Sequence, residues 1–250
     1  MVRLVHLRTI TLCSLAILSF SPRVDAALVI FSGLDVGAKS TDPRPNSDAA
    51  AASFDSAAAL LGSTTLVDFE SAPLGSFTNL TIAPGVSMNG QDINGFPQTI
   101  ANAPYSTPDS LYGYNTTPGG SKFVQLVGGT LTFTFAQGIQ AFGAYLTGVE
   151  LDGETVTFND GTSQTIAIPN EGFNVGGSQF LGFTDAGRLI LSITLTVQAD
   201  DTGDVLGLDD ARWVTAGAAP VVPEPSALSL IAIGLATAAA ASRRLPKPAA

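Results

Sequence analysis

The chain has almost none of the residues on which much hydrolytic and metal chemistry depends. Its 250 residues include one cysteine and one histidine, Cys13 and His6, and both lie within the first 26 positions. The rest of the chain therefore has no thiol nucleophile, no disulfide, and no imidazole to act as a base or metal ligand. This excludes Ser-His-Asp and Cys-His catalytic sites, histidine-ligated zinc and haem, and we expect a protein that is not an enzyme.

Positive charge is also scarce. Residues 27–219 contain 19 of the 21 acidic residues but only five of the 11 Lys and Arg residues, a formal net charge of −14. Such a surface repels nucleic acid and anionic lipid and attracts divalent cations, so no nucleic-acid partner is expected. The alternative is that the acidic exterior only keeps the protein soluble. The five cations are Lys39, Arg44, Lys122, Arg188 and Arg212.

The N-terminus has the three parts of a secretory signal. Arg3 and Arg8 precede an apolar run at 10–20, and Val-Asp-Ala at 24–26 offers a cleavage site of small residues. This pattern predicts a signal peptide over 1–26, removed by signal peptidase. A permanent N-terminal anchor is the alternative, but the apolar run is well short of the ~20 residues that a spanning helix needs.

The C-terminus has the pattern of a second targeting signal. A Pro-Glu-Pro motif at Pro223, Glu224 and Pro225 leads into an apolar run at 227–241, which stops at Arg243 and Arg244. This tail resembles that of PEP-CTERM proteins, in which motif, hydrophobic segment and basic cluster are read together by an exosortase, a membrane-embedded protease. The resemblance implies that these residues form the sorting motif and that exosortase processes the chain.

The hydrophobic part of the tail indicates a weak membrane anchor. Residues 226–242 are close to the lower length limit for a spanning helix, and they are rich in Ala rather than Leu. The basic residues beyond them place the C-terminus in the cytoplasm and the body outside the inner membrane. A transient anchor is expected, and a permanent one is the alternative. The resemblance further implies a bacterium that makes exopolysaccharide, and a final location at the cell surface or in an extracellular biofilm matrix.

The sequence between the signal peptide and the sorting tail predicts a mainly β fold. Polar and apolar residues alternate at 130–135, 155–158 and 192–197, as in strands with one wet face. Asn-Asp-Gly at 159–161 predicts a hairpin between 155–158 and 164–168. Evenly spaced strands without intervening helices favour a jelly-roll-like antiparallel β-sandwich; an immunoglobulin-like sandwich is second, since its Cys and Trp spacing is missing. Further strands are expected at 65–69, 123–127, 141–146, 180–184 and 206–214.

One short helix is expected near the start of the body. Residues 49–61 are almost free of helix breakers, and Asn-Ser-Asp at 46–48 offers capping side chains. A short strand at 28–31 and a loop at 33–45 precede it, and its Ala-rich face can lie close on a sheet. The expected parts of the chain are a signal peptide (1–26), a strand, loop and helix (27–64), the β-sandwich (65–217), a Pro-rich linker (218–225) and the sorting tail (226–250).

A long polar loop is expected at 89–121. It is rich in Asn, Pro, Gly and Ser, and a loop of this length usually has a function. Its aromatic residues could form a flat platform that stacks on sugar rings, with nearby amides bonding hydroxyls. The alternative is that these aromatics pack the loop onto the sandwich. The candidate ligand-binding residues are Phe96, Tyr105, Tyr112 and Tyr114.

Two acidic pieces far apart in the sequence suggest a metal site. Val-Asp-Phe-Glu at 67–70 and Gly-Leu-Asp-Asp-Ala-Arg-Trp at 207–213 resemble the first and last strands of jelly-roll carbohydrate-binding modules. In that family an early Glu and the first Asp of the closing pair, with backbone carbonyls, serve a structural calcium. By position, the resemblance implies Glu70 and Asp209 as the calcium ligands.

The strand pattern supports a partner for Asp209 independently. Asp209 shares a face with Ala211 and Trp213, which should be the core face, whereas Asp210 and Arg212 should point outward. A carboxylate on a core face needs a partner, and calcium takes carboxylate and carbonyl oxygens. The alternative is that Asp209 accepts hydrogen bonds from loop amides.

These features favour binding over catalysis. The expected function is a noncatalytic surface or matrix protein that binds carbohydrate, possible partners being exopolysaccharide and, transiently, the inner membrane. A structural or adhesive protein without a small ligand is the alternative. The third alternative is a carboxylate-dependent glycosidase, whose catalytic carboxylates would be among Glu150, Asp152 and Glu154. A second acidic group at 200–204 lacks the spacing of an EF-hand and reads as a solvated turn.

Overall fold

The computed structural model describes residues 28–149, 155–158, 163–165, 175–197 and 205–217. These residues form 13 strands, all paired antiparallel, and two helices, so the predicted mainly-β fold is confirmed. In chain order they are β1 (Val29–Val36), α1 (Pro45–Ala58), β2 (Thr64–Val67), β3 (Gly75–Phe77), β4 (Leu80–Ala83), β5 (Val86–Gln91), β6 (Gln98–Ala101), α2 (Asp109–Tyr112), β7 (Phe123–Val127), β8 (Gly129–Thr147), β9 (Thr155–Phe158), β10 (Ser163–Thr165), β11 (Gly177–Thr184), β12 (Ile190–Val197) and β13 (Val205–Thr215).

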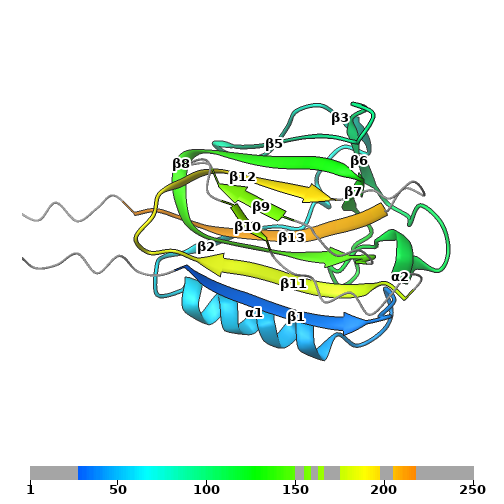
Figure 1. Ribbon diagram of the computed structural model, residues 1–250, viewed down its shortest axis with the longest axis horizontal. Helices are drawn as coiled ribbons and strands as arrows, with labels where there is room; N and C mark the ends of the chain where they lie inside the picture. The colour runs from blue at the N-terminus through cyan, green and yellow to red at the C-terminus, as the bar shows by residue number, and fades with distance from the viewer. Residues whose placement is uncertain (1–27, 150–154, 159–162, 166–174, 198–204, 218–250) are drawn as a thin grey trace, which may run out of the picture.

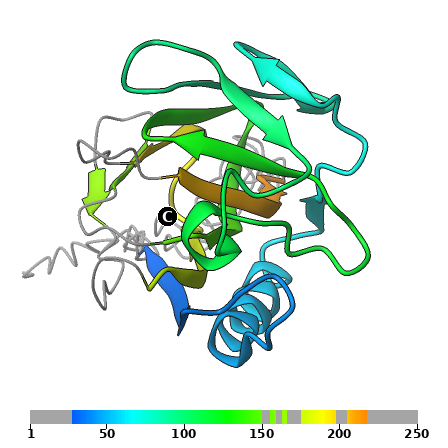
Figure 2. The same cartoon turned by 90° about the vertical axis from the view of Figure 1, so that its right-hand side faces the viewer.

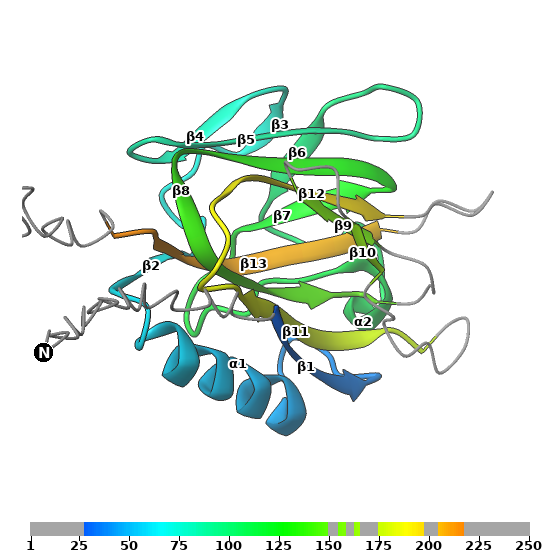
Figure 3. The ribbon, with the colours of Figure 1, turned by 60° about the vertical axis from the view of Figure 1, so that its left-hand side comes forward.

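One long, bent strand makes the sandwich. The first half of β8 pairs with β5 and β12, and its second half pairs with β11 and β13. The pairing with β12 shifts register next to the bend, which turns β8 from one layer into the other (Figures 1 and 3). One layer therefore contains β4, β5, β12, β9 and β10, and the other contains β1, β11, β13 and the strands beside β13.

The core lies between these layers and follows the predicted alternation. In the first half of β8, Leu131, Phe133 and Phe135 are buried, whereas the threonines between them are partly exposed or exposed. Phe133 packs against Phe142 of the second half, with ring centroids 5.0 Å apart. The two halves of β8 thus lie in opposite layers, and their apolar side chains meet in the core between them.

Most predicted strands are found where the alternation placed them. β7 and β9 have the predicted bounds, and β8, β11, β12 and β13 contain the predicted segments. The hairpin pairing is confirmed as well, because Val156 of β9 lies opposite Gln164 of β10. The turn between them, at 159–162, lies outside the described residues.

The prediction of one continuous loop at 89–121 is wrong. The segment contains the end of β5, all of β6 and the one-turn helix α2. β6 has only four residues, too few for alternation to distinguish it from a polar loop. β3 and β4 are similarly short and were not predicted.

The N-terminal segment is an integral part of the sandwich. β1 pairs with β11 over its whole length, and α1 packs on the outer face of that layer (Figure 2). Phe54 of α1 lies between Phe31 and Phe180, which come from the two strands beneath it. A Cβ on Gly33 would lie 2.2 Å from the backbone oxygen of Asn46, so the absence of a side chain there permits the close approach of helix and strand.

The cap of α1 differs from the prediction. The helix begins at Pro45, and its first amides are bound by Asp35 of β1 rather than by side chains at 46–48. Asp35 Oδ1 accepts the N–H of Asn46 at 3.0 Å, and Oδ2 accepts the N–H and hydroxyl of Ser47 at 2.8 and 2.7 Å. Proline suits the first helical position because it has no N–H to satisfy. A cap supplied from another element leaves no local signal in the sequence.

Candidate functional site

The segment 114–122, the pinned loop, joins α2 to β7 at one end of the sandwich. It starts at Tyr114, which is buried, and the Tyr114 hydroxyl donates to the backbone oxygen of Ala38 at 2.8 Å. The Tyr114 N–H donates to Thr147 Oγ1, and this hydroxyl donates in turn to the Tyr114 carbonyl. The loop is therefore fixed to β8 where it begins.

Asp209 holds the middle of the pinned loop. Its side chain is fully buried, and Oδ2 accepts the Thr116 N–H at 2.6 Å, the Thr116 hydroxyl at 3.0 Å and the Thr117 N–H at 3.2 Å. Burial raises the pKa of Asp209 to about 7, and the neighbouring Asp210 adds to the rise, whereas the hydrogen bonds from Thr116 and from the Asp210 N–H lower it. Its burial is as predicted, but the predicted face is wrong: Asp209 lies opposite Tyr145 and Arg212 lies opposite Gly143, so a bulge puts Asp209 on the face of Arg212 and not on that of Trp213. Its contacts are those of a carboxylate that binds loop amides.

Asp210 is not on the outer face, contrary to the prediction. It is buried, and its φ of 49° lies within a register shift between Asp209 and Arg212 in the pairing with β8. Such a bulge breaks the strict inward and outward alternation of a strand. Both aspartates consequently face the pinned loop, and Asp210 accepts the hydroxyls of Thr116 at 3.1 Å and Thr117 at 2.8 Å.

Glu70 holds the far end of the same loop. Its Oε1 accepts the Asn115 side-chain amide at 3.0 Å and the N–H groups of Ser121 and Lys122, each at 2.7 Å. The Lys122 ammonium donates to the carbonyls of Glu70 and Ala72, both at 2.8 Å. The structure thus brings Glu70 and Asp209 to one loop, where each carboxylate already accepts three or more hydrogen bonds.

The geometry of a metal site is not complete in the described part of the chain. No group of three or more His, Cys, Asp and Glu residues there is arranged to hold a metal ion. Beside Glu70, a lysine ammonium binds two backbone carbonyls, which are the kind of ligand that calcium takes. Calcium at Glu70 and Asp209 stays a prediction.

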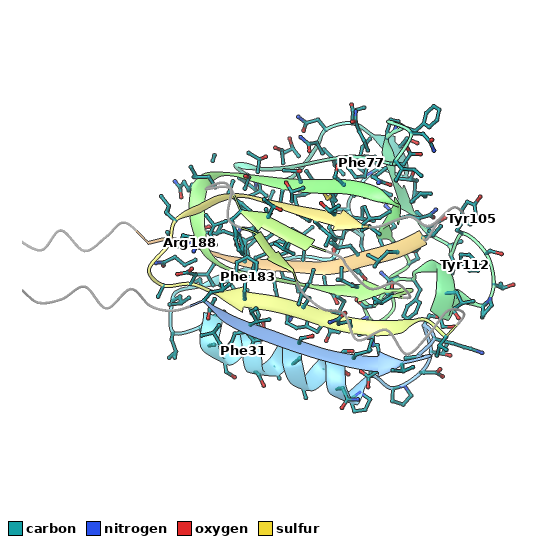
Figure 4. All side chains as sticks on the ribbon, in the orientation of Figure 1. Phe31, Phe77, Tyr105, Tyr112, Phe183 and Arg188 are labelled. Atoms are coloured by element: carbon teal, nitrogen blue, oxygen red, sulfur yellow. The ribbon has the colours of Figure 1, made fainter. Side chains whose placement is uncertain are left out.

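The four candidate aromatic residues do not form one platform. Tyr114 is 1 % exposed, so its ring is not part of an exposed platform, although the residue lines the polar cavity described below, and its role in binding stays a prediction. Tyr105 is 67 % exposed and pairs with the half-buried Tyr112, with ring centroids 6.2 Å apart (Figure 4). Phe96 is also exposed, but it lies in the connection between β5 and β6, where Asp92 binds its N–H.

A polar cavity of about 480 Å³ lies between the pinned loop and the segment 102–104. Tyr105 directly follows Pro104, a lining residue, but neither Tyr105 nor Tyr112 lines the cavity itself. The side chains that line the cavity are mostly uncharged and polar. The lining includes Ser40, Asn102, Asn115, Thr117 and Ser121, with Arg44 as its one charged residue.

Arg44 joins the cavity to the helix layer. Its guanidinium lies 5.3 Å from the centroid of the Tyr145 ring, and Nη2 donates to the Thr116 carbonyl at 3.0 Å. Nη1 is buried and has no hydrogen-bond partner among the described residues. Sequence reasoning missed Arg44, Asn102 and Thr116 as site residues; the only signal was that Arg44 is one of five cations in an acidic body.

Several predicted sites lie outside the described residues. These are the carboxylates Glu150, Asp152 and Glu154, the acidic group at 200–204, the signal peptide, and all five sorting residues of the tail. Within the described part of the chain, no helix is long and apolar enough to cross a membrane.

Comparison with known families identifies the tail. The model of the PEP-CTERM protein-sorting motif matches residues 221–244, which include the Pro-Glu-Pro motif and both arginines. No curated protein matches the chain. The match covers the tail and not the sandwich, so it concerns transport rather than the body. The chain carries a PEP-CTERM sorting motif, which marks it as an exosortase substrate, secreted with a transient C-terminal membrane signal and destined for the surface.

Proposed function

We propose that the sandwich is a noncatalytic carbohydrate-binding body that works in the exopolysaccharide matrix at the cell surface. The observations that support the proposal are the polar cavity beside the pinned loop and the Tyr105–Tyr112 ring pair, which begins at the residue after the lining residue Pro104. Sites for small ligands combine apolar or aromatic surface with a few fixed polar groups. A sugar ring offers both an apolar face and several hydroxyls, so it matches this combination.

The rigidity of the pinned loop supports the same reading. Its backbone is held by Glu70, Asp209 and Thr147, so the cavity wall that it forms is set before a ligand arrives. A preformed wall lowers the entropy lost on binding. Arg44 also lines the cavity, and its guanidinium is fixed there by the Thr116 carbonyl, so the wall carries a positive charge in a set position.

The test is binding of purified residues 27–219 to a panel of polysaccharides that includes the host's own exopolysaccharide. Tyr105→Ala, Tyr112→Ala and Asn102→Ala should each weaken binding, while Leu189→Ala at the opposite end of the sandwich should not (Figure 4 places Arg188 at that end). The melting temperature of each variant serves as the control for folding. Unchanged binding in all three variants would refute the cavity as the glycan site.

A structural or adhesive role without a small ligand is the second candidate. It is favoured by one observation: Tyr105 and Tyr112 contact each other, as aromatics that only secure their own loop would do. Absence of binding to every polysaccharide, together with a lower melting temperature in Tyr112→Ala, would support this candidate.

Calcium at Glu70 and Asp209 belongs to the same proposal as a structural cofactor. Its support is the resemblance of the two strands and the convergence of both carboxylates on one loop. The polysaccharide binding and the melting temperature should therefore be measured in calcium and again in chelator. Equal melting temperatures in both would show that the loop is held by its own hydrogen bonds alone.

A further inference from the structure

Both ends of the described chain leave the sandwich at the same place. β1 starts and β13 ends at one end of the molecule, beside the bend of β8 and opposite α2 (Figures 1 and 3). The end of β13 is fixed there, because Ala216 donates its N–H to the carbonyl of Gly138 at 2.8 Å. The sorting tail therefore starts from this end, which we call the exit face.

The exit face carries large exposed apolar side chains. Leu60, just beyond α1, is 87 % exposed, and Leu189, just before β12, is 56 % exposed. Val29 and Ile30 at the start of β1 are also exposed. A cavity of about 810 Å³ opens beside them, lined by Leu61, Leu189 and Gly217 among others. An exposed apolar cluster of this kind marks an interaction surface.

Charge distinguishes this end from the rest of the acidic body. Arg188 is the one charged residue that lines the cavity, and it pairs with Asp185 at 3.3 Å. Exposed or half-buried carboxylates such as Asp42 and Asp109 lie toward the α2 end, where Asp109 accepts hydrogen bonds from Ser40. Among the described residues, the lining of the exit-face cavity therefore adds no net negative charge that would repel an anionic lipid surface.

The length of the segment before the tail sets an upper limit on the distance between the exit face and the membrane. Eight residues, 218–225, separate Gly217 from the start of the hydrophobic run at Ser226. Even fully extended, they span at most roughly 29 Å. While the tail is embedded, the exit face is therefore the described part of the body that the tail holds within this distance of the bilayer.

We propose that the exit face is a lipid-contact surface, on which the tethered protein rests with Leu60 and Leu189 in the membrane interface. This inference rests on the sorting tail being membrane-embedded and is independent of glycan binding. The contact would orient the body with α2 and the polar cavity away from the bilayer. The lipid contact would end when exosortase releases the tail. The anchor keeps the apolar side chains close to the bilayer, and without it their effective concentration at the lipid surface falls.

The test uses the chain without its predicted signal peptide but with its sorting tail, residues 27–250, inserted through that tail into vesicles of phosphatidylethanolamine and phosphatidylglycerol. This chain has no cysteine, so Leu60→Cys and Leu189→Cys each give one site for an environment-sensitive dye, with Tyr105→Cys as the matched control at the opposite end. Dyes at 60 and 189 should shift to shorter emission wavelengths, be quenched by nitroxide-labelled lipids and be protected from iodide. The dye at 105 should show none of these changes.

Three results would overturn the proposal. If the protein floats with the vesicles but the dyes at 60 and 189 behave as the dye at 105 does, the face is exposed to water. If they are protected from iodide without quenching by nitroxide lipids, a second copy of the chain covers the face. If the protein does not float with the vesicles, the membrane anchor itself is refuted, and glycan binding by residues 27–219 is unaffected.

Discussion

Asp209 of β13 accepts the backbone N–H of Thr116 at 2.6 Å, although 93 positions separate the two residues. The one hydrogen of the Thr116 hydroxyl is shared between Asp209 and Asp210, so one threonine joins the pinned loop to the closing strand. Since both carboxylates and the hydroxyl are buried, these bonds have no water to replace them. The position of the cavity wall depends on this contact.

The first prediction removes that hydroxyl. Thr116→Val keeps the shape of the side chain but removes the one hydroxyl hydrogen that Asp209 and Asp210 share, so we expect a loss of about 1–3 kcal/mol in the free energy of unfolding. Urea denaturation measures it. Thr81→Val, at an exposed position of β4, is the control and should change the stability little. Equal effects of the two substitutions would contradict the role of Thr116 in holding the loop.

The second prediction concerns pH and Asp209. Burial raises the pKa of this carboxyl from 3.8 to about 7, so between these values the folded protein holds a proton that the unfolded chain releases. The free energy of unfolding should therefore fall as the pH rises from about 4 to about 7, by at most about 1.4 kcal/mol per pH unit, and this contribution should be constant above 7.

Asp209→Asn isolates this contribution. The variant cannot titrate at this position, so the difference in stability between wild type and variant should change between pH 4.5 and pH 7.5 in favour of the variant. Denaturation curves at the two pH values measure the difference. If wild type instead gains stability relative to the variant as the pH rises, the donors around the carboxylate outweigh its burial, and the pKa of Asp209 is lowered rather than raised.

The third prediction tests calcium against Lys122. The Lys122 ammonium binds the carbonyls of Glu70 and Ala72, so in wild type a calcium ion using those oxygens would have to displace it. Lys122→Met removes the ammonium and should lower the melting temperature. If the carbonyls and Glu70 can hold calcium, millimolar calcium should restore stability in this variant more than in wild type.

Glu70→Gln in the Lys122→Met background is the matched control for the metal, because an amide is a much weaker calcium ligand than a carboxylate. The double variant should lose any restoration by calcium. A melting temperature in Lys122→Met that does not respond to calcium would argue against a calcium site at Glu70.

The fold was predictable from sequence where the signal is local. The alternation in β8, β9 and β12 correctly predicted which of their residues are buried. Asp209 is buried as expected, but for another reason, because the bulge after it puts it on the face of Arg212 and not on that of Trp213. The partners of Asp209 were not predictable, because Thr116 belongs to a distant loop. The burial of Asp210 was missed for another reason: a bulge reverses a strand face and has no signature in the residues around it.

The cap of α1 leads to the fourth prediction. Asp35 binds two N–H groups and one hydroxyl at the start of the helix, and it is buried. Asp35→Ala should lower the free energy of unfolding by about 2 kcal/mol or more, since N-cap losses reach about 2 kcal/mol even at exposed positions. Asp42→Ala, which removes an exposed carboxylate from the neighbouring loop, should cost much less. Thermal melts of the two variants provide the comparison.

The last prediction concerns the contact between α1 and the sheet. A Cβ on Gly182 of β11 would lie 2.7 Å from the ring of Phe54, and that ring cannot retreat easily because Phe31 and Phe180 pack against it. Gly182→Ala should therefore displace the helix and cost about 1–3 kcal/mol, as overpacking does in other cores. Gly217→Ala is the control, since a Cβ there meets no atom within 4 Å. Because the pinned loop is bound to Asp209 and Glu70 rather than to α1, Gly182→Ala should lower the melting temperature without weakening glycan binding at 25 °C. A loss of binding in the folded variant would show that the helix layer also positions the cavity, through Arg44.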